Sequence, residues 1–132
     1  MPETDWAGVY ASEPLSSLEH CDDSDVAGWI TASLPFRGSK VDWARVPGEH
    51  QHWPGAELST VLPLLESHLA NGAGAIHIGD NLSPCGVRIG ASDLAAVPAL
   101  LAIPEHHYLV ADDRSWVLVI TFEGDVDLVE LS

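Results

Sequence analysis

The clearest pattern of apolar and polar positions lies in the last third of the chain. Three apolar runs, Tyr108 to Ala111, Trp116 to Phe122 and Val126 to Leu131, are separated by short polar groups. The group from Asp112 to Ser115 has side chains that can hydrogen-bond the local backbone, and the next group contains Gly124, which tolerates positive φ. The pattern predicts three strands joined by tight turns, an antiparallel meander.

The faces of these strands differ in polarity. The run from Trp116 to Phe122 is apolar on both faces except at Thr121, which predicts a central strand covered from two sides. In the last run, Asp127 and Glu130 lie on opposite faces, each beside apolar residues. This mixture is typical of a strand nearer the sheet edge, where charge discourages aggregation.

A helix is predicted in the middle of the chain. Leucines recur at helical intervals between Leu58 and Asn71. Its N-cap is expected at Ser59 or Thr60, because Pro63 is tolerated in a first turn.

Two short strands and a second helix are predicted after it. Gly74 to Ile78 and Gly86 to Ile89 are the expected strands. The second helix is capped by Ser92, is kinked or split at Pro98 and ends before Pro104.

The first half of the chain has a weaker pattern, so its fold is left open. Val26 to Leu34 fits a strand or a short helix, and Pro35 to Gly55, with several Gly and Pro, predicts irregular structure. The elements together predict an α+β fold: an antiparallel sheet with the C-terminal three-stranded meander and helices packed on one face, a two-layer sandwich. The length suits a single domain, residues 1–132.

Charge narrows the class of partner. Twenty acidic and five basic side chains give a formal net charge of −15 at pH 7. A field of this sign repels nucleic acid and anionic lipid and speeds encounter with a cationic protein. With 46% hydrophobic residues the chain should nevertheless fold. The chain has no apolar run near membrane-helix length and its N-terminus is unlike a secretory signal, so we expect a soluble, cytoplasmic protein.

The acids gather towards both ends of the sequence. Residues 1–35 hold seven acids and no Lys or Arg, and residues 105–132 hold seven acids and only Arg114 as a cation. If the fold brings the chain ends together, these groups form one anionic patch. The alternative is ordinary solubilising surface charge.

Seven histidines raise the question of a metal site. His50 and His52 are alternate residues and share one face of an extended strand, but a catalytic zinc usually needs a third protein ligand. The HExxH and paired CxxC patterns are absent. We expect no metal and no other cofactor, although metal binding by His50 and His52 is left open.

Motifs for nucleophilic catalysis are equally weak. Gly-x-Ser-x-Gly does not occur, and His77 is a weak candidate partner for Cys85. Cys21 and Cys85 are expected to be reduced thiols, given the adequate core and the missing export signal. We therefore expect a protein that is not an enzyme.

In size, acidity and α+β character the chain resembles the small cytoplasmic immunity proteins that bacteria pair with secreted polymorphic or contact-dependent toxins. The resemblance implies a binding protein that neutralises a basic toxin domain, such as a nuclease, by covering its active cleft with carboxylates. The candidate contacts are Asp22, Asp23, Asp25, Asp112, Asp113, Glu123, Asp125, Asp127, Trp43 and Trp53.

Two other function classes remain open. One is a small metal-dependent or thiol enzyme that uses the His-rich loops, and the other is a regulatory or scaffolding module. The identity of the partner and the oligomeric state are not determined by the sequence.

Overall fold

The computed structural model describes residues 8, 10–11, 15–22, 24–37, 40–46, 49–55, 58–70, 74–80, 85–103 and 105–130. Its strands are β1 (Glu19–Cys21), β2 (Phe36–Arg37), β3 (Lys40–Val41), β4 (Glu49–Trp53), β5 (Ala75–Gly79), β6 (Gly86–Ile89), β7 (His107–Ala111), β8 (Trp116–Ile120) and β9 (Val126–Glu130). Its helices are α2 (Ser24–Ser33), α3 (Leu58–Leu69) and α4 (Val97–Leu101), with 3-10 turns η1 (Leu15–Ser17), η2 (Trp43–Arg45) and η4 (Ala91–Ala96).

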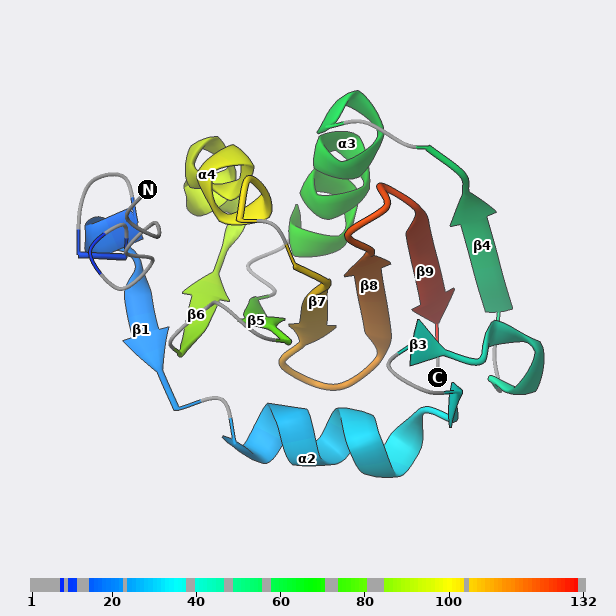
Figure 1. Ribbon diagram of the computed structural model, residues 1–132. Coiled ribbons are helices and arrows are strands. Elements are labelled where there is room, and N and C mark those ends of the chain that lie inside the picture. The colour runs from blue at the N-terminus through cyan, green and yellow to red at the C-terminus, as the bar shows by residue number, and fades with distance from the viewer. Residues whose placement is uncertain are drawn as a thin grey trace, which may run out of the picture.

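One antiparallel sheet organises the described residues. Its seven strands follow the order β1-β6-β5-β7-β8-β9-β4, and β2 and β3 pair as a separate hairpin (Figure 1). The three C-terminal strands are consecutive neighbours, which confirms the predicted meander and the α+β class. None of the helices in the described part of the chain combines the length and the apolar run that crossing a bilayer requires.

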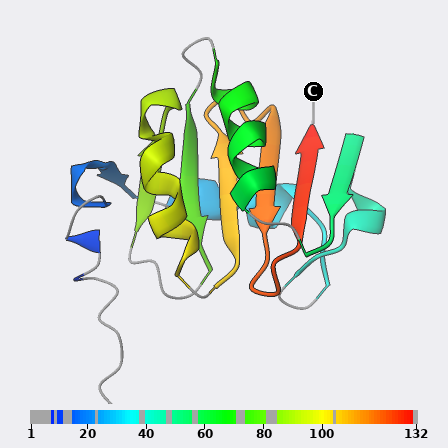
Figure 2. The same cartoon turned by 90° about the horizontal axis from the view of Figure 1, so that it is seen from above.

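Helices cover both faces of the sheet, and this corrects the predicted two-layer arrangement with helices on one face. Figures 1 and 2 show α3 and α4 side by side on one face and α2 on the other. Alternate residues of β8 divide between the two cores: Leu118 packs in the α3 and α4 cluster, and Val117 and Val119 in the α2 cluster. A strand that is apolar on both faces needs a cover on each, so a third layer follows.

The segment that fits either a strand or a helix is the helix α2. Val26, Ile30 and Leu34 recur every four residues and are all buried against the sheet. This spacing places one side chain per turn on the same helix face. The following segment is not irregular either, since it contains the β2–β3 hairpin, η2 and the edge strand β4.

The predicted helix boundaries shift by one or two residues. Helix α3 begins at Leu58, so Ser59 and Thr60 lie inside the helix rather than at its cap. The next helical segment begins after Gly90, whose backbone N–H donates to the Asp93 carboxylate (2.8 Å).

The predicted split at Pro98 is confirmed. The segment starts as the 3-10 turn η4 and continues as α4, with Pro98 in the first turn of α4. Proline is tolerated there because the first N–H groups of a helix have no intrahelical acceptor.

The core on the α3 and α4 face contains two hydrogen-bonded histidines, His77 of β5 and His107 of β7. His107 Nε2 lies 2.8 Å from the Ile103 carbonyl oxygen, and His77 Nε2 lies 2.9 Å from His107 Nδ1. Because a carbonyl only accepts, His107 carries its proton on Nε2, and its Nδ1 accepts from His77. The His107 ring is thus neutral. Burial and the neighbouring His107 lower the pKa of His77 to about 3, and burial lowers the pKa of His107.

We expect the α2 layer to contribute measurably to stability. Ile30→Ala should lower the free energy of unfolding by about 2–5 kcal/mol, because it removes a buried side chain from the α2 core. Thr31→Ala, at the exposed next position, should change it by less than about 0.5 kcal/mol. Urea unfolding of both variants provides the comparison, and equal losses would contradict the buried position of α2.

The histidine pair predicts a loss of stability in mild acid. The unfolded chain takes up a proton on His77 near pH 6.5, whereas the folded chain does not until about pH 3, so unfolding becomes easier as the pH falls through this window. By pH 5 the loss from His77 should reach about 2 kcal/mol. His77→Gln, which can still donate to His107 but does not titrate, should have a flatter stability curve between pH 7 and 5. A curve as steep as that of the wild-type protein would refute the assignment.

Candidate functional site

The acids of the β7–β8 turn are engaged in local structure. Asp112 binds Arg88 (Nη2 to Oδ2, 2.7 Å), which also contacts Glu19 of β1 at 3.2 Å. Asp113 Oδ1 accepts hydrogen bonds from the hydroxyl and the backbone N–H of Ser115, and these bonds lower the pKa of Asp113. The turn is the tight connection predicted from the sequence, and one of its carboxylates is already paired with a cation.

The N-terminal candidates lie at the far edge of the sheet. Asp22 follows β1, and its Oδ1 accepts from the backbone N–H (2.8 Å) and hydroxyl (2.7 Å) of Ser24, where α2 begins. Asp25 is exposed in the first turn of α2, and Asp23 lies outside the described residues. Since β1 and β9 are five strand spacings apart, about 24 Å separates these acids from those of β9.

The acidic ends of the sequence therefore do not merge into one patch among the described residues. Successive turns of an antiparallel meander lie at opposite ends of its strands, so the β7–β8 turn and the β8–β9 turn are apart. Glu19 and Asp112 do meet, but they meet on Arg88.

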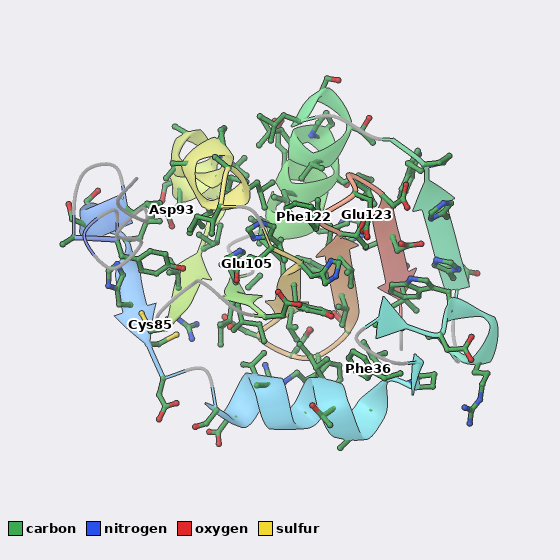
Figure 3. All side chains as sticks on the ribbon, viewed as in Figure 1. Phe36, Cys85, Asp93, Glu105, Phe122 and Glu123 are labelled. Carbon is green, nitrogen blue, oxygen red and sulfur yellow. The ribbon has the colours of Figure 1, made fainter. Side chains whose placement is uncertain are left out.

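The β8–β9 turn presents an exposed aromatic side chain among carboxylates. The sequence predicted a strand up to Phe122, but β8 ends at Ile120, and Phe122 is 63% exposed in the turn. Glu123 follows it, and Gly124 closes the turn with φ of 90°, as its predicted role requires. Figure 3 labels Phe122 and Glu123 at this end of the sheet.

Three further segments lie beside this turn, and they hold His106, Asp80 and Gly55. The Phe122 backbone N–H donates to His106 Nδ1 (2.9 Å), and the His106 N–H donates to Asp80 Oδ1 (3.1 Å). Asp125 completes the turn and accepts from the Gly55 N–H (3.1 Å). We call the group Asp80, His106, Phe122, Glu123 and Asp125 the Phe122 surface.

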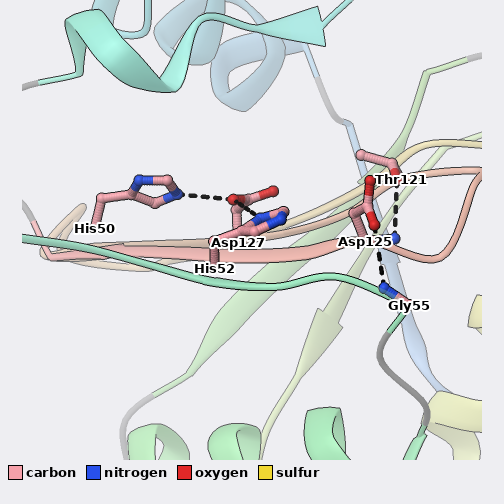
Figure 4. A network of polar contacts seen from close by, with 6 residues as sticks. All are labelled: His50, His52, Gly55, Thr121, Asp125 and Asp127. Carbon is pink, nitrogen blue, oxygen red and sulfur yellow. Dashed lines mark hydrogen bonds and ion pairs between the residues drawn. The ribbon is translucent and has the colours of Figure 1, made fainter.

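Asp127 is not a surface residue, which removes it from the candidate partner contacts. It is 2% exposed, and its Oδ1 lies 2.7 Å from both His50 Nε2 and His52 Nδ1 (Figure 4). The antiparallel register of β4 and β9 places His52 opposite Asp127. His50, two residues away, shares that face because side chains alternate along a strand.

The two candidate tryptophans are half-buried packing residues. The Trp43 ring stacks on His50, with centroids 4.5 Å apart and planes 8° from parallel. Trp53 packs against the core under α3 and α4. Among the described residues Phe122 is more exposed than either tryptophan.

A cavity of about 120 Å³ adjoins the histidine and aspartate cluster. Its lining includes His52 and Asp127, together with Trp43, His106 and Tyr108. Burial, together with the negative charge of Asp80, raises the pKa of Tyr108 to about 12, so its phenol keeps its proton at neutral pH. The cavity wall thus combines hydrogen-bond donors with a buried carboxylate.

The suggested pair of Cys85 and His77 is not formed. His77 Nε2 contacts His107, and His77 Nδ1 has no hydrogen-bond partner among the described residues. A thiol nucleophile activated by this histidine has no support in the geometry.

Sequence reasoning missed Asp80 and Phe122 and the pairing of Asp127 with the histidines. Phe122 had one usable signal, an apolar residue directly before the turn residues Glu123, Gly124 and Asp125. The other residues come together only through strand pairing, for which the sequence gives no register.

Comparison of this chain with protein-family models, with curated proteins and with solved structures gives no match.

Proposed function

We propose that this protein binds and neutralises a basic protein partner, and that the Phe122 surface is the centre of the contact. The observation that carries the proposal is the 63% exposure of Phe122 on loops that also hold Asp80, Glu123 and Asp125. An aromatic side chain surrounded by polar groups is the usual composition of an interface hot spot.

The charge distribution supports a cationic partner. The net charge of −15 draws a basic protein towards the molecule and raises the rate of encounter. Two of the arginines are engaged elsewhere. Arg88 binds Glu19 and Asp112, and Arg114 lies over the Trp29 ring (5.6 Å to its centroid). Both side chains are remote from the carboxylates of the β8–β9 turn. We therefore centre the contact on the Phe122 surface, at the opposite end of β8 from Arg114.

The partner that fits best is a nuclease toxin domain, with this chain acting as its cytoplasmic immunity protein. A nuclease needs cations in its cleft to hold phosphate, and carboxylates on projecting loops can occupy that cleft instead. Phe122 would add an apolar contact that phosphate does not offer, which favours one partner over other basic proteins.

A second candidate function, a small metal-dependent enzyme, is favoured by the cluster of His50, His52 and Asp127. The adjoining cavity of about 120 Å³ is below the roughly 300–1,000 Å³ of most small-molecule sites. The binding function therefore ranks first.

Rescue of growth tests the proposed function. If a neighbouring gene encodes a secreted protein with a basic, toxic C-terminal domain, co-expression of this protein with that domain should restore growth. In that complex, Phe122→Ala should weaken binding at least about tenfold, as expected for the loss of a hot-spot residue. Asp25→Lys, on α2, serves as the control and should leave rescue intact. Absence of rescue by the wild-type chain, together with absence of binding, would overturn the proposal.

Salt dependence separates electrostatic steering from contact energy. Glu123→Lys should slow association strongly at low salt and only weakly at high salt, because the Debye length falls from about 30 Å at 0.01 M to about 3 Å at 1 M. Stopped-flow association rates provide the measurement, with Asp25→Lys as the matched charge change. If both variants slow association equally at every salt concentration, the contact is not centred on the Phe122 surface.

A further inference from the structure

We propose that His50, His52 and Asp127 form a binding site for one divalent transition-metal ion such as Zn²⁺. These residues lie beside the Phe122 surface, whose His106 and Asp125 line the same cavity as His52 and Asp127. The inference does not depend on the proposed partner. The three ligand atoms, one from each side chain, all lie within 4.8 Å of one another. Two imidazoles and one carboxylate are a common ligand set for mononuclear zinc and iron sites.

The fold holds these ligands on two adjacent strands. His50 and His52 lie on the edge strand β4, and Asp127 lies on β9, which pairs with β4 over five residues. The Trp43 ring stacks on the His50 ring and so restricts the orientation of this imidazole. The paired strands hold the backbone of the three ligands in place, so binding an ion would require only side-chain movement.

Binding an ion would require the ligand atoms to move by about 0.6 to 1.5 Å relative to one another. A tetrahedral ion with bonds of about 2.0–2.1 Å separates its ligand atoms by about 3.3 Å. The two nitrogen-to-oxygen distances are now 2.7 Å, those of hydrogen bonds. Side-chain rotations would have to widen each nitrogen-to-oxygen distance by about 0.6 Å and bring the two nitrogens, now within 4.8 Å, up to about 1.5 Å closer. Each imidazole would then carry its ring proton on the nitrogen that faces away from the ion.

The burial of Asp127 is a physical reason why a cation would bind at this site. A carboxylate at 2% exposure loses most of its hydration, which is costly unless a cation or several donors replace the water. The imidazoles of His50 and His52 each make one hydrogen bond, and both bonds are to the same oxygen, Oδ1. A bound divalent cation would compensate the carboxylate directly and join the edge strand β4 to β9.

One coordination position of the ion would remain for water. Three protein ligands leave a fourth tetrahedral position open. His52 and Asp127 also line the cavity of about 120 Å³, which is large enough for a few water molecules. The half-exposed ring of His52 (45% of its side chain) provides a route for the ion from solvent.

Calorimetric titration of metal-free, untagged protein with Zn²⁺ tests the site. We expect one ion per chain. His50→Gln, His52→Gln and Asp127→Asn should each weaken binding more than about a hundredfold, since loss of an outer-shell partner alone costs about 10- to 100-fold. The matched control is His20→Gln, on β1 at the opposite edge of the sheet, and it should bind as the wild-type protein does.

A second measurement uses the wild-type fold and reports the position of the ion. Co²⁺ or Cu²⁺ bound beside His50 should quench Trp43 fluorescence, and Trp43→Phe should remove most of that quenching while retaining the stoichiometry of Zn²⁺ binding. No saturable binding by the wild-type protein, or binding that the three ligand variants leave unchanged, would overturn the proposal. So would quenching that is the same in Trp43→Phe as in the wild-type protein.

Discussion

The two-sided burial of the β7–β8 hairpin is the constraint on which the rest of the structure depends. Every residue of both strands is buried. Such strands cannot lie at an edge or expose a face, so further strands must flank them and apolar layers must cover both faces. The buried apolar side chains of α2 cover one face, and those of α3 and α4 cover the other.

The same constraint separates the acidic ends of the chain. With β7 and β8 in the interior, β1 is placed at one edge, and β9 and β4 at the other side of the sheet. N-terminal and C-terminal acids are thereby spread over a wide molecule, and Glu19 and Asp112 meet on a shared arginine. We therefore place the proposed partner contact on the Phe122 surface rather than on a broad anionic face.

The edge strand β4 contributes polar side chains, His50 and His52, that hydrogen-bond a carboxylate buried in the sheet. Its burial pattern is mostly exposed, yet it pairs along its whole length with β9. Asp127 would be an uncompensated buried charge without the imidazoles of β4, and those imidazoles would be ordinary surface groups without Asp127. The proposed ion site and the packing of the edge strand are thus parts of one arrangement, and the cavity beside it is also lined by His106 and Asp125 of the Phe122 surface.

The sequence by itself determined the meander, the two later helices, the split at Pro98 and the turn at Gly124, because each follows from local periodicity or from the backbone limits of proline and glycine. It even contained the sign of a third layer, in a central strand apolar on both faces. Tertiary structure alone decided that α2 is a helix on the second face, that β4 is a strand, and that Asp127 faces two histidines. These depend on strand order and register, which are set by contacts between residues as far apart as His50 and Asp127, and no local pattern encodes such pairings.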